Sequence, residues 1–396
     1  MPLDRPGYSG SVGQAPDPVV RRAAVVEGDA AGVARALRAQ MGGFRPGLVI
    51  AFASSRLDGG AVAGALQEVF APATVVGCTS HGELGDGGDR EGAVVVLAIA
   101  SRHLRVGAAL APDLRRSALR SSRAAVIDAA AQLGLAPDAL DARRHVALTF
   151  VDGRSGVEES FCLGSAATAP HIRFVGGSAS DDFGPEPRTR VFFGGGAHAD
   201  AGVVVLLDCG LPFAVIEAEH MVPTQVRVVV TAADPDHRLV LELDGYPAVS
   251  RYRELVERCG GPAVDDVSAA SFPFATYVGG RPYVRSVAKI EADGLRFAAA
   301  VDAGAVLRLM RPGDLVGSTE EALEQARVAV GGELAAVVAF SCLGRHREAI
   351  TRGEREALSA LYGRVPLVGF HSFGEQTGAL LVNHTLTGLA LGGARD

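Results

Sequence analysis

Lysine and asparagine are almost absent from this sequence, since each occurs once in 396 residues. The only lysine, Lys289, does not follow a glycine, so a P-loop, which requires Gly-Lys followed by Ser or Thr, is excluded. The same scarcity confines any Schiff-base chemistry to Lys289. The only asparagine is Asn383, and a residue type used once directs attention to its surroundings.

Long apolar runs, basic clusters and a leader pattern are also missing. No stretch approaches about 18 uninterrupted apolar residues, so we expect no membrane span. The start, MPLDRPGYSGSVGQAPDP, has no apolar signal-peptide core. We therefore expect residues 1–24 to be a disordered lead-in and the protein to be cytoplasmic. The net charge of −7, without a basic cluster, argues against nucleic-acid binding.

The five cysteines contain no Cys-x-x-Cys pair and lie singly in or beside apolar runs. This pattern supports neither a disulfide framework nor a zinc ribbon. Hydrophobic residues make up 48% of the chain, enough for two or three domains with a sizeable core.

An internal repeat organises the chain. Apolar strands are expected at GLVIAFAS, HVALTFVDG and AAVVAFSCLG, and each is followed by a helical segment and a second strand. The second strands run into similar turns, GCTSHGEL, GGSASDDF and GFHSFGEQ. Continuous Val, Ile, Leu and Ala runs are typical of strands buried on both faces. The pattern predicts an α/β architecture of repeated βαββ units with mainly buried mixed sheets.

A different region separates the second and third repeats. A β-hairpin is expected around Asp234–Asp236, a helix in YPAVSRYRELVERCG, and an antiparallel run of strands in the segment that starts at Arg281. We therefore divide the chain into the lead-in, an N-terminal domain of residues 25–245 and a C-terminal domain of residues 246–396. The antiparallel segment and the third repeat belong to the C-terminal domain, and the two domains are expected to enclose a cleft.

The three turns lie where α/β proteins bind ligands, beyond the carboxyl ends of strands. Our hypothesis is that the first and third turns face one inter-domain pocket. In the competing structural interpretation, hydroxyls cap the following segment, carboxylates bind backbone amides and glycines only permit the turn. The predicted ligand-binding residues are Cys78, Thr79, Ser80, His81, Glu83, Asp152, Gly177, Ser178, Asp182, Cys342, Arg345, His371, Ser372, Glu375 and Asn383.

Other chemistries are weaker alternatives. Cys78 and Cys342 end strands near histidines, but a buried thiol is commoner than a nucleophile. His81 and His371 come together as metal ligands only if the first and third turns meet, and either is a candidate axial ligand for a haem. Arg345 follows a strand end and is placed to hold a carboxylate bidentately. The turn DGRSG, which begins at Asp152, only weakly suggests phosphate binding.

The segments VVGCTSHGELG, VDGRSG and FVGGSASDDFG, with FPFATYVGG, FSCLGRHREAI, LVGFHSFGEQTG and NHTLTGLAL, resemble the FIST family of bacterial sensory proteins. The similarity covers about residues 30–393. It departs from the family at His81, where a small residue is usual, and near His371, where Tyr or Asn is common.

The resemblance implies a non-enzymatic sensory input module that binds amino acids or related metabolites. Its output partner would be a separate histidine kinase, cyclic-di-nucleotide enzyme or chemoreceptor. Some family members are haem proteins that sense nitric oxide, so a haem sensor is the second hypothesis and a cysteine-dependent enzyme the third. No cofactor follows firmly from the sequence.

Overall fold

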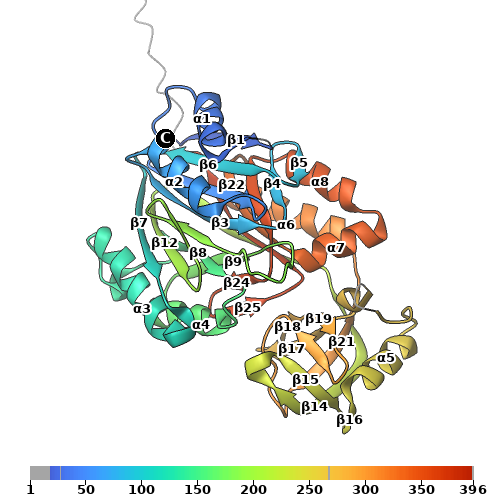
Figure 1. The fold of residues 1–396 in the computed structure, drawn as a ribbon. Helices are drawn as coiled ribbons and strands as arrows, with labels where there is room; N and C mark the ends of the chain where they lie inside the picture. Colours follow the sequence, from blue (N-terminus) through green and yellow to red (C-terminus); the bar gives the residue numbers. More distant parts are fainter. Residues whose placement is uncertain (1–17, 27, 266–267, 395–396) are drawn as a thin grey trace, which may run out of the picture.

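A computed structural model describes residues 18–26, 28–265 and 268–394 (Figure 1). It is an α/β fold in which one unit of structure occurs three times, as the internal repeat predicts. Each unit consists of a strand, a helix, a strand, one or two helices, a strand, a short hairpin and a final strand. A separate antiparallel sheet is inserted into the third unit after its first strand.

Unit one begins with an edge strand, of which residues 19–24 fall in the lead-in that was predicted to be disordered. Residues 1–17 of that lead-in lie outside the described residues. The elements of unit one are β1 (Val19–Val25), α1 (Ala30–Gln40), β2 (Leu48–Ser54), α2 (Gly59–Phe70), β3 (Thr74–Ser80), β4 (Glu83–Gly85), β5 (Gly88–Arg90) and β6 (Val94–Ala100).

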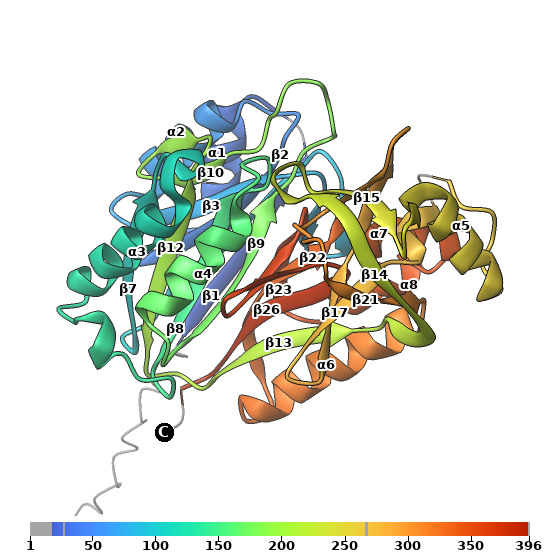
Figure 2. The same cartoon turned by 90° about the horizontal axis from the view of Figure 1, so that it is seen from below.

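Unit two repeats this order, and its helices α3 and α4 pack against the same face of their sheet (Figure 2). Its elements are β7 (Leu104–Ala111), α3 (Leu114–Gln132), η1 (Pro137–Ala139), β8 (His145–Asp152), α4 (Glu158–Thr168), β9 (Arg173–Ala179), β10 (Val191–Phe193), β11 (Gly196–His198) and β12 (Gly202–Cys209).

Unit three is interrupted by the insertion, and its α6 lies against β13 (Figure 2). Its elements are β13 (Phe213–Glu219), α6 (Leu315–Ala329), β22 (Leu334–Cys342), α7 (Leu343–Arg352), α8 (Arg355–Gly363), β23 (Leu367–Ser372), β24 (Glu375–Thr377), β25 (Leu380–Val382) and β26 (Thr385–Gly392).

The inserted sheet forms a separate lobe in Figure 1, next to α7. It includes the predicted hairpin around Asp234–Asp236 and the predicted helix, both confirmed. Its elements are β14 (Val222–Asp234), η2 (Pro235–His237), β15 (Leu239–Leu243), β16 (Tyr246–Pro247), α5 (Ala248–Arg258), η3 (Ser268–Ser271), β17 (Phe274–Val278), β18 (Arg281–Arg285), β19 (Val287–Ile290), β20 (Leu295–Phe297) and β21 (Val306–Arg311).

The central strands follow from the apolar runs in the sequence. Every residue of β2 is buried, and β2 pairs parallel with β3 and antiparallel with β6. The connecting helix α2 starts at Asp58, whose carboxylate accepts hydrogen bonds from the backbone N–H groups of Gly60 and Ala61. Such a cap satisfies N–H groups that have no partner within the helix, so it fixes where the crossover from β2 begins.

The three units exchange their hairpins in a closed cycle. The β4–β5 hairpin of unit one joins the sheet of unit three beside β23. The β10–β11 hairpin of unit two joins unit one beside β3, and the β24–β25 hairpin of unit three joins unit two beside β9. Each unit therefore supplies strands to a neighbouring sheet, and each of these three sheets has six strands.

The cycle of hairpins closes around a shared core. Phe52, Phe150 and Phe340 occupy equivalent positions on β2, β8 and β22, and their ring centroids lie 5.9, 6.4 and 5.9 Å apart. All three side chains are fully buried. Because each ring comes from a different unit, burial of these rings stabilises the units together.

No helix among the described residues combines the length and apolar character needed to cross a membrane.

Candidate functional site

The three predicted turns meet at the centre of the molecule. The His371 N–H donates to the carbonyl of Gly82 at 2.9 Å, which joins the third turn to the first. The Ser178 N–H donates to Gly374 at 2.8 Å, which joins the second turn to the third. The first and third turns are therefore in direct backbone contact.

Two of the predicted carboxylates bind their own turns and the adjacent strand. Ser80 donates to Glu83 at 2.5 Å, and the other oxygen of Glu83 accepts from the backbone N–H of Ala93 at 2.9 Å. In the third turn, Ser372 donates to Glu375 at 2.5 Å. Burial raises the pKa of each carboxyl to about 8. These contacts match the structural interpretation of the repeated serine and carboxylate.

Beside the second turn, a different carboxylate accepts hydrogen bonds from the backbone N–H groups. Its residue at the position of Ser80 is Ala179, and Asp182 instead faces outward, where its Oδ1 lies 3.0 Å from His81 Nδ1. Asp152, at the end of β8, accepts from the backbone N–H groups of Asp200 at 2.7 Å and Arg154 at 3.0 Å. Asp152 therefore satisfies backbone groups at the place where the second turn has no buried glutamate.

Other predicted residues lie in the core. Cys78 is fully buried in β3, and burial raises its thiol pKa well above the ordinary value. Thr79 accepts from the Arg190 N–H at 2.8 Å and holds the β10 hairpin. Gly177 lies where a Cβ would be 2.9 Å from Phe340.

Arg345 is also buried, but its guanidinium contacts other side chains of unit three instead of lining a cavity. Its guanidinium lies 3.1 Å from His220 Nδ1 and donates to the hydroxyl of Thr319 at 2.6 Å. His220 in turn contacts Glu348 at 2.8 Å. Arg345 therefore belongs to a buried polar network that packs α6 against α7.

A pocket of about 220 Å³ lies between the inserted sheet and units two and three. The inserted sheet contributes Arg238 and Ser286 to its lining, unit two contributes Arg154 and Phe183, and unit three contributes several residues around the ends of β22 and β23. Three of the predicted site residues line this pocket, namely Cys342, Ser372 and Asn383. It is the place where the predicted residues meet the inserted sheet.

Asn383 is the most informative residue of this pocket. It is fully buried, and neither its amide oxygen nor its amide nitrogen has a hydrogen-bond partner among the described residues. The next residue, His384, has φ of 55°, and its ring nitrogens likewise have no hydrogen-bond partner there, although Nδ1 lies 3.7 Å from Glu348 Oε2. Buried polar groups are almost always paired, so an unpaired side-chain amide in a pocket wall is a candidate ligand-binding group.

Two arginines and two aromatic rings form the outer part of the pocket. The Arg347 guanidinium carbon lies 4.6 Å from the centre of the Phe183 ring, and this guanidinium has no ion pair among the described residues. Arg154 lies 5.7 Å from the Phe373 ring and pairs with Asp181 at 2.7 Å. The pocket therefore presents one uncompensated positive charge beside an aromatic surface, which suits an anionic group attached to an apolar one.

Phe183 is held in an unusual conformation. Its φ is 58°, and its side chain is 49% exposed although it stacks on Phe373 at 4.7 Å. A bulky residue rarely adopts positive φ, and such strain concentrates at functional sites. Phe183 and His384 are two non-glycine residues with positive φ, and both line this pocket.

The surroundings of the two candidate haem ligands do not fit a haem. His371 is 3% exposed and contacts Asp89 at 3.0 Å, and the cavity beside it measures about 10 Å³. Pockets for small molecules are typically about 300–1,000 Å³, so a porphyrin has no room there. His81 is half-buried, and its Nδ1 lies 3.0 Å from Asp182 Oδ1.

The sequence reasoning missed half of the pocket. Arg154 lies inside the quoted VDGRSG segment, and Arg347 and His384 lie within two residues of predicted positions, so spacing alone was a usable signal for them. Phe183 follows Asp182 directly. No signal in the sequence joins Arg238 or Ser286 to these turns, because their proximity depends on how the inserted sheet docks.

Comparison with known families finds two adjacent domains in this chain. Residues 47–246 match the FIST N domain and residues 248–377 match the FIST C domain. No curated protein matches the chain. Among solved structures, the crystal structure of cyanuric acid hydrolase from A. caulinodans aligns over 95% of this chain and 99% of that chain, with a TM-score of 0.40 and 10% identity.

Proposed function

This chain belongs to the FIST family, whose domains are sensory domains of signalling proteins, and from that premise we propose that it binds a small carboxylate-bearing metabolite in the Asn383 pocket. Amino acids and related compounds are the proposed ligand class. The proposed role is binding without turnover, with output through a separate signalling protein.

The observation that carries the proposal is the unpaired amide of Asn383. A buried donor and acceptor without partners cost roughly 1–3 kcal/mol, a cost that a ligand removes by bonding to both. An amide can donate to one ligand oxygen and accept from a ligand N–H or O–H. This pair of functions suits an amino acid, which carries both kinds of group.

The charge of the pocket supports a carboxylate. Arg347 is the uncompensated cation, and a guanidinium binds a carboxylate in a planar, bidentate way. The rings of Phe183 and Phe373 offer an apolar surface for the rest of the ligand. Glu158 also lines the pocket and offers oxygen acceptors for an ammonium group.

The position of the pocket supports a sensory mechanism. Its walls come from the inserted sheet on one side and from units two and three on the other, so a ligand that contacts both sides favours their closed arrangement. A ligand shifts such an equilibrium only as far as it binds one arrangement more tightly. The partner would then recognise the closed arrangement.

A thermal-shift screen of amino acids and small organic acids tests the proposal. A true ligand at 100 times its Kd stabilises the protein by about 2.7 kcal/mol. Asn383→Leu should keep the fold, because it removes two unpaired polar atoms at similar volume, and should abolish the shift. Arg347→Met should weaken binding of carboxylates, whereas Arg123→Met on the exposed side of α3 should not.

Two results would contradict the proposal. One is a wild-type protein that no member of the library stabilises, and the other is a shift that Asn383→Leu leaves unchanged. Mass spectrometry of the ligand after prolonged incubation separates binding from catalysis, since the proposal requires the ligand to be recovered unaltered.

A further inference from the structure

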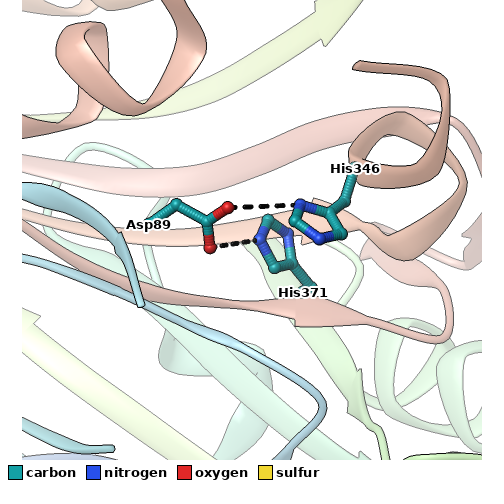
Figure 3. Close-up of side chains that lie close together, drawn as sticks. All are labelled: Asp89, His346 and His371. Carbon is teal, nitrogen blue, oxygen red and sulfur yellow. Dashed lines mark hydrogen bonds and ion pairs between the residues drawn. The ribbon is translucent and has the colours of Figure 1, made fainter. Parts of the chain in front are cut away.

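Two histidines and an aspartate converge where the exchanged hairpin of unit one docks on unit three. Asp89 comes from β5, His346 from α7 and His371 from β23 (Figure 3). Asp89 Oδ1 lies 3.0 Å from His371 Nε2, and Asp89 Oδ2 lies 3.4 Å from His346 Nδ1. One ligand atom from each residue lies within 4.8 Å of the other two.

We propose that Asp89, His346 and His371 bind a divalent transition-metal ion, of which Zn²⁺ fits best. This site is separate from the Asn383 pocket, and its test does not depend on the proposed function. The bound ion would link unit one to unit three at the place where the β4–β5 hairpin docks.

The spacing of the three residues suits zinc. Zinc binds imidazole nitrogen and carboxylate oxygen at about 2.0–2.2 Å, so two ligand atoms at a tetrahedral angle lie about 3.3 Å apart. His371 Nε2 lies 3.0 Å from Oδ1 of Asp89 and His346 Nδ1 lies 3.4 Å from Oδ2, so each histidine nitrogen is about this distance from one of the two carboxylate oxygens. Two histidines and one carboxylate are a ligand set that zinc and other first-row metals share.

A small closed space adjoins the three side chains. The cavity measures about 10 Å³, and its walls also include Ser341 and Tyr362. That volume is about the size of one water, so it suits a single ion or an ion's fourth ligand and nothing larger. The side chains are nearly enclosed, at 6% exposure for Asp89 and His346 and 3% for His371.

A neighbouring arginine holds the carboxylate of the cluster in place. Arg355 donates to Asp89 at 2.9 Å and so orients the carboxylate.

The charge around this cluster favours a cation. Asp89 and Glu91 carry two negative charges, and Arg355, which pairs with both, carries one positive charge. The two carboxylates therefore outnumber the arginine by one negative charge. A divalent cation would therefore be drawn to this cluster.

A second group, His220, Glu348 and His384, has similar ligand atoms but different surroundings. The guanidinium of Arg345 lies 3.1 Å from His220, and Arg352 pairs with Glu348 at 2.8 Å. Two positive charges next to one carboxylate oppose a metal ion there, so this group serves as an internal comparison.

Cobalt substitution tests the proposal with the full chain. After treatment with a chelator, one equivalent of Co²⁺ should give the visible d–d bands of a low-coordinate site, and Zn²⁺ should bleach them and raise the melting temperature. Elemental analysis after desalting should find about one zinc per chain. His346→Gln and Asp89→Asn should lose the bands and at least ten-fold in zinc affinity.

Two matched variants serve as controls. His237→Gln, at an exposed histidine of the inserted sheet, and His220→Gln, in the second group, should retain the bands. Circular dichroism shows whether each variant folds, and if His346→Gln or Asp89→Asn fails to fold, the result of the other one of these two is used. A folded wild-type protein without Co²⁺ bands would show a plain ion-pair cluster and overturn the proposal, as would bands lost in His220→Gln but kept in His346→Gln.

Discussion

Arg238 of the inserted sheet lies 2.5 Å from Glu158 of unit two, and both residues line the Asn383 pocket. The Glu158 side chain is 3% exposed and that of Arg238 is 16% exposed. Arg238 also contacts Glu159 at 2.7 Å. This nearly buried ion pair therefore holds the inserted lobe against unit two at the edge of the pocket.

Arg238→Ala should destabilise the protein by roughly 1–3 kcal/mol, because it leaves the nearly buried Glu158 carboxyl without its hydrogen-bond partner. Burial raises the pKa of Glu158 to about 7 even with Arg238 present. Above pH 7 the double variant Arg238→Ala/Glu158→Gln should regain part of the loss, since it removes the cost of keeping an unpaired Glu158 protonated. Urea denaturation measures both, and a single variant within 0.5 kcal/mol of wild type would show that the pair does not hold the lobe.

The protein should lose stability as the pH rises from about 6.5 to 8, because of Glu83 and Glu375. Both have folded-state pKa values of about 8, above their unfolded value of 4.5, so the folded state binds more protons between these values. Stability is then greatest on the acid side of this window and falls by at most roughly 2.7 kcal/mol per pH unit for the two groups together. Denaturation at a series of pH values measures the slope.

The matched variants for this slope are Glu83→Gln and Glu375→Gln. Glutamine can donate to the serine hydroxyl and accept from the backbone N–H, so each variant keeps the contacts and removes the titration. Burial lowers the pKa of His220 from 6.5 to about 4, so below about pH 6.5 the unfolded state binds a proton that the folded state does not. His220 therefore reduces the stability of the protein only below about pH 6.5 and does not contribute to the slope in this window. Glu158, whose pKa is about 7, leaves a small residual slope. A slope that the double variant leaves unchanged would contradict the assignment.

The sequence predicts the repeat well because the signal is local. The apolar runs of β2, β8 and β22 and the turns after their partner strands are all present in the structure. The exchange of hairpins was not predicted, because the pairing of Leu84 with Gly369 joins residues that share no local pattern. The sequence of the β4–β5 hairpin is equally compatible with pairing beside β3 of its own unit.

The candidate site was likewise predictable from the sequence only in part. Asn383 stands out by composition, and Cys342 and Ser372 follow from strand ends, so the unit-three wall of the pocket was predictable. The opposite wall depends on how Arg238 and Ser286 are carried by the inserted sheet, which no periodicity encodes. The repeated carboxylates Glu83 and Glu375 were predicted to bind a ligand. In the structure they bind their own turns and adjacent backbone N–H groups, because a buried carboxyl group needs hydrogen-bond partners.

Gly177→Ala should destabilise the protein by roughly 1–3 kcal/mol through overpacking. The added methyl would lie 2.9 Å from Phe340 and 3.0 Å from Phe370, in the core shared by the three units. Gly43→Ala is a suitable control, because a Cβ there meets nothing within 4 Å. Thermal unfolding measures the cost. If Gly177 instead contacts a ligand, the variant would lose affinity at unchanged stability, which we do not expect.

Phe183→Gly should separate the stability of the protein from its ligand binding. Glycine relieves the strain of φ at 58°, which costs roughly 1–3 kcal/mol for a non-glycine residue, so unfolding should change little despite the lost ring contact with Phe373. Affinity for a ligand of the Asn383 pocket should fall at least several-fold, because the aromatic surface beside Arg347 is gone.

Two further variants complete this comparison. Asp113→Gly relieves a similar φ of 52° on an exposed residue that does not line the pocket, so it should stabilise the fold and leave affinity unchanged. Phe183→Leu keeps the strained backbone but loses the aromatic ring, so it should weaken both stability and binding. Calorimetric titration with the ligand found in the thermal screen measures the affinities. Equal affinity of wild type and Phe183→Gly would mean that the strained phenylalanine serves the fold and not the pocket.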